Sequence, residues 1–450
     1  MYKILQVLLF VSVLSFQSLY AQVWQDLGDI SGDAFYRHDD VYFTSPQVGY
    51  TVYYSANPDV KIGTIFKTTN AGQSWNAAKV SDGTHFRCIT FMDDQIGIAG
   101  NLGKGSFDNT SDTIPIYRTT DSGQTWTGIN PDPTNLKGLC ALFKVNDNTI
   151  YGAGRVRGPA HLVKSMDKGA TWTVIDLLAT AGLGAATDLY FTSPDTGFVI
   201  GMNATPFTTG TTATYKGKVV YTTNGGLTWS TVLEEPLNPT YFWKISFPTK
   251  TTGYVSLQQN TATFQSVVYY KTTNSGQNWV RNEIPTSLFG APVNFRAQGI
   301  GFVNENRGWI GGGGFATNFL ETLDGGTTWS NLTSTFSFRV NKIRFFGDYA
   351  YSAGIRVHRW FDPLATDEDQ KLESSVLLYP NPCRDVVHIK LNADVWKQAV
   401  VSVHSVTGAE LKSQTIENES SVSMLGFKSG VYFVRVKAGE RLWIRRIVRE

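Results

Sequence analysis

The residues with the clearest chemical potential are Asp and Asn side chains that recur in eight-residue segments ending in Trp. They are Asn70, Asp121, Asp167, Asn224, Asn274 and Asp324. Carboxylates in such a series can ligate calcium or act as general acids and bases. Three of the six are Asn, however, and an amide cannot transfer a proton. Because Asn and Asp both accept hydrogen bonds from their own turn, we expect these residues to be structural.

Two further carboxylates, Asp40 and Asp188, each lie three residues before a Phe of a second repeated series. If the repeats form a ring, the two acids are three repeats apart and can face each other across its axis. A carboxylate pair in a cleft is the arrangement that hydrolyses glycosidic bonds. Solvated carboxylates in loops have the same sequence appearance. A carbohydrate-active hydrolase is therefore kept as the alternative function rather than the preferred one.

Cations are concentrated six residues before the Phe residues of the same series. Those positions hold Arg37, His85, Lys137, Ala185, Tyr241, Arg296 and Arg339. With nearby side chains they define the candidate ligand-binding residues Arg37, Arg87, Lys137, Tyr241, Trp243, Lys244, Arg296 and Arg339. Around one mouth of a channel, such cations suit a carboxylate, a sulfate or an acidic protein segment, and the aromatic rings can stack on a sugar. The alternative is that the cations pair with Asp39, Asp40 and Asp188.

Other chemistries have little basis in the sequence. It contains no GxSxG, HExxH or Walker motif, and its six His lack metal-ligand spacing, so we expect no cofactor and no metal. Three Cys exclude a disulfide framework, and Cys88 and Cys140 are predicted to be buried free thiols. A net charge of +2 argues against binding to nucleic acid. A non-enzymatic role is therefore favoured.

The elements that must position these residues follow from the two repeats. We name the eight-residue segments box turns: TTNAGQSW, TTDSGQTW, SMDKGATW, TTNGGLTW, TTNSGQNW and TLDGGTTW. The Phe series comprises Phe43, Phe91, Phe143, Phe191, Phe247, Phe302 and Phe345. Each Phe strand is followed by a tight turn and a second strand. A third apolar strand leads into the box turn, and the Trp of the box turn opens a fourth strand. Each unit of about fifty residues is thus predicted to be a four-stranded antiparallel sheet.

The box turns resemble the Asp-box, or BNR repeat, of β-propellers. This resemblance implies a structural turn that joins the two outer strands of a blade. Over residues 22–361 the whole pattern also resembles the photosystem II assembly-factor propellers, which implies protein binding without catalysis. Sialidases share the Asp-box, but no local motif for their arginine triad and Tyr nucleophile is visible. The hydrolase alternative, sialidase-like or glucanase-like, therefore depends on the central cleft alone.

Seven Phe strands and six box turns predict a seven-bladed propeller. The last unit, near residues 343–361, supplies only three strands, and Trp24 resembles a box Trp without its box. We expect residues 22–28 to add the missing strand, because closure removes the open edges of the array. A six-bladed ring with spare ends is the rival arrangement.

The ends of the chain have different compositions. Residues 1–21 combine Lys3, an apolar run and a small residue at the expected cleavage site, which is typical of a signal peptide. Residues 362–374 contain five acids and one Lys and are predicted to be an acidic linker. Residues 375–450 alternate apolar and polar side chains, as in a small β-sandwich. The predicted fold class is all-β: a seven-bladed β-propeller followed by a small Ig-like β-sandwich.

The C-terminal segment resembles the type A C-terminal sorting domain of the type IX secretion system of Bacteroidetes. The resemblance is carried by LYPNPCRD, HSVTGAEL, SGVYFVRV and the basic end WIRRIVRE. It implies that residues 375–450 meet an outer-membrane translocon and a sortase, and that the protein is secreted or lies on the outer-membrane surface. No transmembrane segment is expected after signal removal. The sequence thus predicts an exported binding or scaffold propeller with an unknown protein or acidic glycan at its channel mouth.

Overall fold

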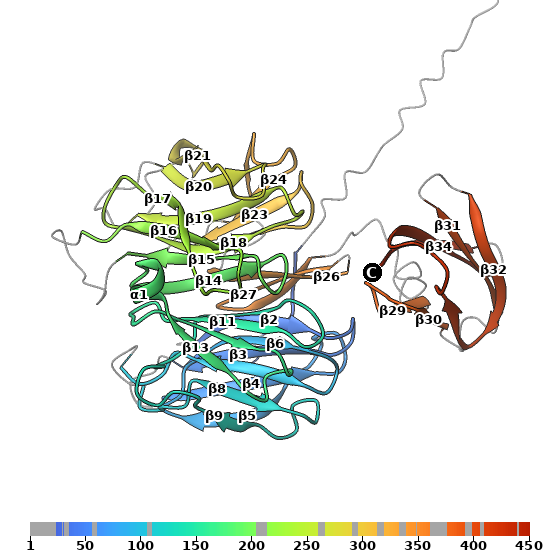
Figure 1. Cartoon of the computed structure of the whole chain (residues 1–450), viewed down its shortest axis with the longest axis horizontal. Coiled ribbons are helices and arrows are strands. Elements are labelled where there is room, and N and C mark those ends of the chain that lie inside the picture. Colours follow the sequence, from blue (N-terminus) through green and yellow to red (C-terminus); the bar gives the residue numbers. More distant parts are fainter. Residues whose placement is uncertain are drawn as a thin grey trace, which may run out of the picture. The chain divides into compact units, whose positions relative to one another are not determined.

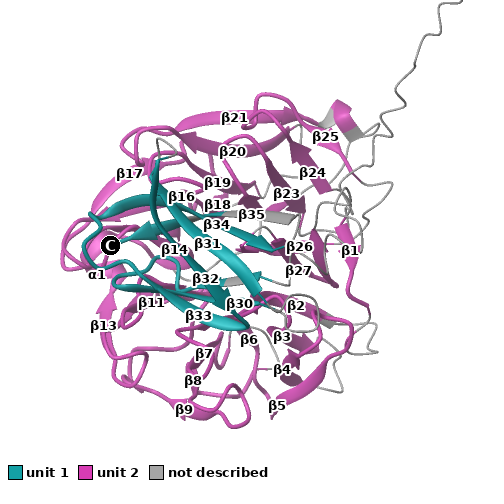
Figure 2. Cartoon of the chain, turned by 90° about the vertical axis from the view of Figure 1, so that its right-hand side faces the viewer, with its two compact units in different colours: residues 1–22, 362–450 teal, residues 23–361 magenta. Residues whose placement is uncertain are grey.

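The computed structural model describes residues 24–28, 30, 36–55, 61–105, 110–203, 214–259, 266–289, 296–312, 319–332, 339–347, 349–360, 376–391, 398–405, 409–438 and 441–450. The chain forms two compact units, one spanning Val23–Phe361 and the other containing Asp362–Glu450 (Figure 2). Both are built from antiparallel strands, and the predicted all-β fold is confirmed. The predicted signal peptide and acidic linker lie outside the described residues.

Seven four-stranded sheets form the described part of the first unit, and each is one blade of a propeller. Blade 1 is β2 (Tyr36–Phe43), β3 (Gly49–Ser55), β4 (Ile62–Thr68) and β5 (Asn76–Asp82); blade 2 is β6 (Phe86–Phe91), β7 (Gly97–Asn101), β8 (Ile116–Thr119) and β9 (Thr127–Ile129); blade 3 is β10 (Ala141–Lys144), β11 (Ile150–Gly154), β12 (His161–Ser165) and β13 (Thr173–Asp176). Blade 4 is β14 (Ala185–Phe191), β15 (Gly197–Met202), β16 (Gly217–Thr222) and β17 (Ser230–Glu234); blade 5 is β18 (Thr240–Ser246), β19 (Gly253–Gln259), β20 (Ser266–Thr272) and β21 (Val280–Pro285); blade 6 is β22 (Ala297–Phe302), β23 (Gly308–Gly312), β24 (Phe319–Thr322) and β25 (Ser330–Asn331). Blade 7 is β26 (Val340–Phe346), β27 (Tyr349–Gly354), β28 (Val357–Trp360) and β1 (Trp24–Asp26).

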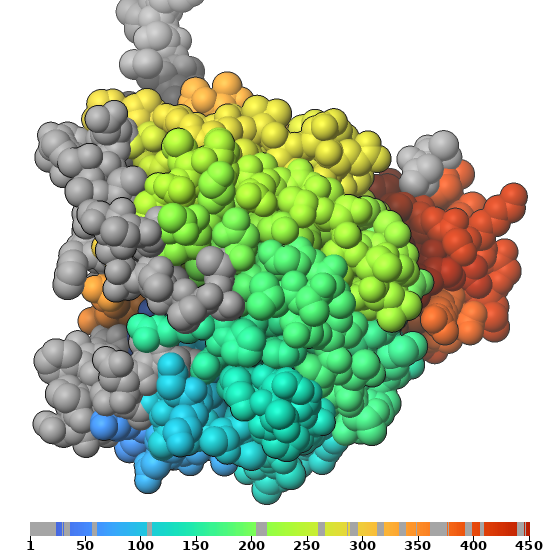
Figure 3. All heavy atoms as spheres, turned by 60° about the vertical axis from the view of Figure 1, so that its left-hand side comes forward, coloured from blue at the N-terminus to red at the C-terminus, as the bar shows by residue number. Residues whose placement is uncertain are grey.

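The blades form a ring, which Figure 1 shows from the side with the colours following the order of the chain. Figure 2 shows the outer strands β5, β9, β13, β17, β21, β25 and β1 in sequence around its rim. Figure 3 shows from another side that successive blades, coloured in chain order, pack directly against each other. The short helices α1 (Leu177–Ala181) and η1 (Thr286–Phe289) follow β13 and β21.

The ring is closed by the N-terminal strand, as predicted. β1 pairs with β28 in antiparallel register, with Trp24 opposite Trp360. The Trp24 ring also packs edge-on against Trp309 and Phe319 of blade 6, with centroids 5.3 Å away in both cases. One aromatic side chain thus joins the closing strand to the neighbouring blade.

Aromatic rings stack between neighbouring blades at the level of the Phe series. Tyr351 of blade 7 lies on Phe43 of blade 1, with ring centroids 3.9 Å apart. The same contact is made by Tyr50 with Phe91, by Tyr151 with Phe191, and by Tyr254 with Phe302. Phe43 also covers Gly49 of its own hairpin, where a Cβ would lie 2.6 Å from the ring. The spacing from Phe to Gly therefore has a steric cause.

The box turns are organised by a hydrogen-bond acceptor that both Asp and Asn supply. In blade 2, Asp121 Oδ1 accepts hydrogen bonds from Thr119 Oγ1 at 2.7 Å and from the Thr125 N–H at 2.8 Å. Thr119 Oγ1 accepts in turn from the Gly123 N–H at 2.9 Å. Asn70 accepts the equivalent bonds in blade 1. Because the amide replaces the carboxylate here, the turn depends on the oxygen rather than on its charge.

Where the residue is Asp, the turn holds it ionised. Hydrogen bonds from Thr125 and Thr328 lower the pKa of Asp121 and Asp324, respectively, to about 2. Burial acts to raise the pKa of Asp167, but hydrogen bonds led by those from Thr171 outweigh it and lower the value to about 2. These acids therefore bind protons less readily in the folded chain than in the unfolded one.

The second unit contains two sheets around one apolar core. One consists of β29 (Val376–Tyr379), β30 (Val386–Leu391) and β33 (Glu419–Ser423), in that order. The other has the order β32 (Glu410–Glu417), β31 (Gln398–Ser405), β34 (Gly430–Ala438) and β35 (Arg441–Arg449). Buried Cys383 connects the first segment to the last, since its N–H donates to Val448 O and its carbonyl accepts from Glu450 N. The arrangement is the predicted small β-sandwich.

We predict that replacing the three box acids by Asn makes the propeller less sensitive to acid. Their folded pKa of about 2 lies below the ordinary value of 3.8, so they stabilise the fold above pH 3.8, and this stabilisation is lost as the pH falls through 2. The variant Asp121→Asn/Asp167→Asn/Asp324→Asn should lose less thermal stability between pH 4 and 2 than the wild type. Circular dichroism measures this, with Asp82→Asn as the control. Identical pH profiles would contradict the role assigned to these turns.

We also predict that Trp24→Ala destabilises the propeller by about 3–5 kcal/mol, because it empties a large buried aromatic site. The free energy of unfolding in urea, followed by far-UV circular dichroism, measures this loss. Val80→Ala on outer strand β5, where the side chain is 55% exposed, should change it by less than about 0.5 kcal/mol. Equal effects of the two substitutions would show that β1 does not secure the ring.

Candidate functional site in the central channel

The inner strands bring the candidate residues to the axis. Three residues before each Phe of the series stand Asp40, Cys88, Cys140, Asp188, Lys244, Gly299 and Lys342. In six of the seven inner strands that the structure describes, a β-bulge shifts the register close to this position. A bulge re-aims neighbouring side chains. In β2 the shift falls between His38 and Asp40, and Asp39 and Asp40 are both buried there.

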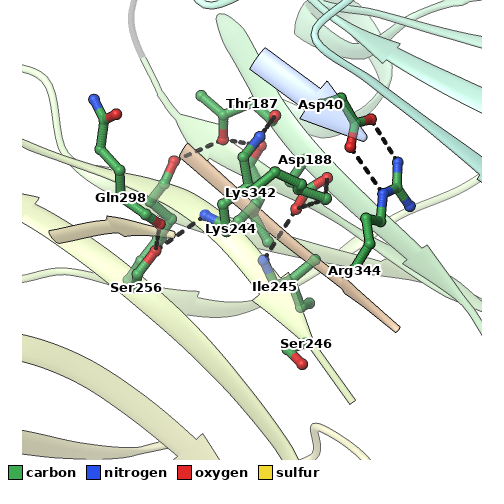
Figure 4. Close-up of polar contacts among 12 residues, drawn as sticks. Asp40, Thr187, Asp188, Lys244, Ile245, Ser246, Ser256, Gln298, Lys342 and Arg344 are labelled. Carbon is green, nitrogen blue, oxygen red and sulfur yellow. Dashed lines mark hydrogen bonds and ion pairs between the residues drawn. The ribbon is translucent and has the colours of Figure 1, made fainter. Parts of the chain in front are cut away.

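Two ion pairs cross between blades in the channel (Figure 4). Arg344 of blade 7 donates from Nε and Nη2 to the two carboxylate oxygens of Asp40, at 2.9 and 2.7 Å. Lys342, also of blade 7, donates to Asp188 of blade 4 at 2.8 and 2.9 Å. The backbone N–H of Ile245 completes the contacts of Asp188 at 3.2 Å. We call Asp40, Asp188, Lys244, Lys342 and Arg344 the central network.

The pairing of Asp188 works against a role as general acid. Burial raises its pKa, but Lys342 and Lys244 outweigh this and hold the pKa below its usual range. A glycosidase acid needs the opposite shift, so that it carries a proton at neutral pH. Asp40 is likewise buried and bound by a guanidinium.

Lys244 is a buried cation within the same network. Its Nζ donates to the Thr187 carbonyl at 3.3 Å, and only 4% of the residue is exposed. Burial lowers its pKa to about 8, although the Asp188 carboxylate opposes this shift. Cys88 and Cys140 lie nearby as buried thiols without a disulfide, and burial raises the pKa of both.

A second polar group, the Asp39 cluster, lies towards the start of the inner strands. The Asp39 carboxylate accepts from Arg37, Arg87 and His85, the last at 2.6 Å, and from Asn341 at 3.3 Å. Burial raises the pKa of Asp39, but the two guanidinium groups and His85 hold it well below its usual range. Burial lowers the pKa of His85 to about 4, so the imidazole donates its hydrogen bond in the neutral form.

Arg87 connects this cluster to the far side of the channel. Its guanidinium lies 5.5 Å from the ring centroid of Trp243, which belongs to blade 5. Trp243 packs edge-on against Tyr241 at 5.0 Å and donates from Nε1 to Gln258 at 2.5 Å. Arg87, Tyr241 and Trp243 are all buried. Side chains from opposite blades therefore meet inside the channel.

The structure divides the eight candidate residues into two groups. Arg87, Tyr241, Trp243 and Lys244 are buried inside the channel. Lys137 and Arg296 are exposed, while Arg37, whose side chain is 27% exposed, and Arg339 are half-buried. We call these last four residues the cationic mouth. Burial lowers the pKa of Arg37; Asp39 acts against this, whereas Arg87 and Arg339 lower it further, so the guanidinium groups converge.

Sequence reasoning missed Lys342, Arg344 and Asn341. Lys342 had a detectable signal, since it lies three residues before Phe345, in phase with Asp40 and Asp188. The alternative that the cations pair with nearby acids holds for Arg37 and Arg87, which bind Asp39. Asp40 and Asp188 are bound instead by these unforeseen residues of blade 7.

We predict that Lys244 makes stability rise between pH 8 and 10.5. Its pKa is about 8 in the folded chain, below the ordinary value of 10.5 that applies to the unfolded chain, so the unfolded state binds more protons in that range. Lys244→Met should remove this rise in the melting temperature, whereas Lys137→Met at an exposed site should retain it. Parallel pH profiles for the wild type and Lys244→Met would refute the shift.

Comparison with known proteins identifies the C-terminal unit. Residues 377–450 match the family described as "Secretion system C-terminal sorting domain". The protein is thus exported by the type IX secretion system and is secreted or located at the cell surface. Among the described residues, no helix has the length and hydropathy to cross a membrane. No curated protein matches the sequence.

Solved structures resemble the propeller at low sequence identity. "YCF48 bound to D1 peptide" aligns with a TM-score of 0.51 and 16% identity, over 72% of this chain and 93% of that chain. YCF48 from Cyanidioschyzon merolae aligns with a TM-score of 0.53 and 14% identity, over 76% of this chain and 100% of that chain. At these identities the likeness shows that the chain has a β-propeller fold.

Proposed function

We propose that the propeller is a non-enzymatic binding or scaffold module, and that its cationic mouth docks an anionic group of a protein or a glycan. The observation that carries this proposal is the convergence of guanidinium groups from blades 1, 2 and 7. Arg87 and Arg339 are both close enough to Arg37 to lower its pKa. Asp39 already pairs with two of these groups, Arg37 and Arg87, and an anion bound at the mouth relieves the repulsion that remains.

The two groups of candidate residues have different parts in this proposal. Arg37, Lys137, Arg296 and Arg339 meet the ligand, because each retains exposed surface. The buried residues support the mouth from inside; Asp39, for example, orients Arg37. Guanidinium groups bind carboxylates and sulfates through paired hydrogen bonds, so these are the ligand groups we propose. The YCF48 structure that contains a D1 peptide is a propeller that holds a protein segment, which supports a protein ligand.

We also propose the division of the chain into a signal peptide at 1–21, a propeller at 22–361, a linker at 362–374 and a sorting domain at 375–450. The sorting domain would engage the type IX translocon and then a sortase. We further assign the box turns as Asp-box (BNR) repeats with a structural role. The equivalent bonds of Asn70 and Asp121 support that role, because an amide has no acid–base function.

The hydrolase alternative receives no support from the channel. Asp40 and Asp188 are buried, and each is bound to a cation. An acid–base pair needs carboxylates whose environments push their pKa values apart and leave one of them protonated. The pKa of Asp188 is lowered instead. We therefore advance no catalytic function.

The test measures binding of the mature protein to an array of sulfated, uronate-containing and neutral glycans, and to proteins pulled down from the producing cells. We predict that Arg296→Ala and Lys137→Ala each weaken binding of the anionic ligand by about tenfold, since a hydrogen bond to a charged group contributes roughly 1.5–3 kcal/mol. Arg37→Gln should act in the same direction. Binding should also weaken as salt increases.

Two control variants distinguish specific binding at the cationic mouth from a general effect of net charge. Arg296→Lys retains the positive charge and should retain most of the binding. Lys250→Ala removes an exposed cation from the turn at the other end of an inner strand and should leave binding unchanged. Retention that is the same in all variants would rule out the cationic mouth as the ligand site.

A further inference from the structure

A cavity of about 220 Å³ lies at the end of the channel where the inner strands finish, opposite the cationic mouth. Its walls are largely aromatic. They include Tyr42, Phe43, Phe143, Tyr190, Phe247 and Phe345, from blades 1, 3, 4, 5 and 7. Phe345 is 36% exposed and Phe143 and Phe247 are half-buried, so the cavity is reached from solvent. We call this space the aromatic cavity.

The floor of the aromatic cavity presents cations without their carboxylate partners. Lys342 and Arg344 line it, with 12% and 18% of their side chains exposed. Asp188 and Asp40, which bind these cations, do not line it and are almost completely buried. No Asp, Glu, Asn or Gln is among the described residues that line the cavity. The charged groups that line the cavity are thus hydrogen-bond donors, Lys342 and Arg344.

Two hydrogen-bond donors at this floor, Arg344 and Lys342, have capacity left. Arg344 donates hydrogen bonds from Nε and Nη2 to Asp40, whereas its Nη1 makes no hydrogen bond to any described residue. Lys342 directs its ammonium group to the Asp188 carboxylate, which leaves one N–H. Ser246 also lines the cavity, but its Oγ accepts from the Phe302 N–H at 3.2 Å and points away from the two cations (Figure 4). Donors without acceptors beside an apolar wall favour an anionic ligand with an apolar body.

The charge of the central network points the same way. It contains two carboxylates, Asp40 and Asp188, and three cations, Lys244, Lys342 and Arg344 (Figure 4). A buried charge without a partner costs free energy, and this excess amounts to one positive charge. The lowered pKa of Lys244 is the response of the buried group to that cost. One negative charge at the floor of the cavity completes the balance.

We propose that the aromatic cavity binds a small organic monocarboxylate, with the carboxylate on Arg344 and Lys342 and a single ring or short apolar chain against the aromatic walls. The volume agrees, because protein cavities of about 150 Å³ admit benzene. The site is separate from the cationic mouth, since it lies at the other end of the inner strands and shares no exposed residue with it. It therefore goes beyond the function proposed above.

The experiment is calorimetric titration of the full mature chain with benzoate, and with benzamide and benzylamine as neutral and cationic analogues of the same shape. Benzoate should bind at least about tenfold more tightly than benzamide, and benzylamine should not bind. Lys342→Gln should weaken benzoate binding by about tenfold, while Lys342→Arg should retain it. Phe345→Trp adds bulk at a partly exposed wall and should weaken benzoate binding without changing any charge.

Each outcome decides the proposal. Equal affinities for benzoate and benzamide, or no benzoate binding at millimolar concentration, would overturn anion recognition. Unchanged binding in Phe345→Trp would overturn the location, and this variant decides the matter even if Lys342→Gln does not fold. Arg296→Ala at the cationic mouth should leave benzoate affinity unchanged, so that failure at one end of the channel is distinguishable from failure at the other.

Discussion

Closure of seven sheets around one axis is the constraint on which the rest of the structure depends. The strand that completes the ring, β1, has only three residues and pairs with β28. Such a short ladder adds few hydrogen bonds, so packing has to supply much of the stability. Trp24 meets Trp309 and Phe319 of the neighbouring blade, and Tyr351 of the closing blade stacks on Phe43 of the first. The seam is secured by aromatic contacts on both of its sides.

Closure also determines how charge is buried in the channel. Asp40 and Asp188 are buried on the inner strands, and a buried carboxylate needs a cationic partner. Blade 7 provides those partners: Arg344 binds Asp40 of blade 1, and Lys342 binds Asp188 of blade 4. The blade that completes the ring thus also supplies the cations that pair with these two carboxylates. An open ring would leave both carboxylates without their cations, which couples the polar network to closure.

The blade count and its closure were predictable because sterics and turn chemistry repeat along the chain. Phe43 requires Gly49, and each box turn needs its acceptor oxygen, so the blade period is visible in the residues themselves. The pairing inside the channel was not predictable. Phase placed Asp188 on the axis, but spacing cannot show which blade faces it with a cation. Nor can it show that Trp243 covers Arg87, because that burial depends on a strand three blades away.

The chemistry of the channel follows from its excess of cations over carboxylates. A carboxylate that is held by a cation, as Asp188 is, stays ionised and accepts a proton less readily, and this disfavours acid–base catalysis. The same pairing leaves cations in excess, since Lys244 has no carboxylate of its own among the two that the network contains. Arg87 and Trp243 meet as buried side chains inside the channel. An interior that is already paired but positively charged overall is suited to holding anions at its openings rather than to transforming them.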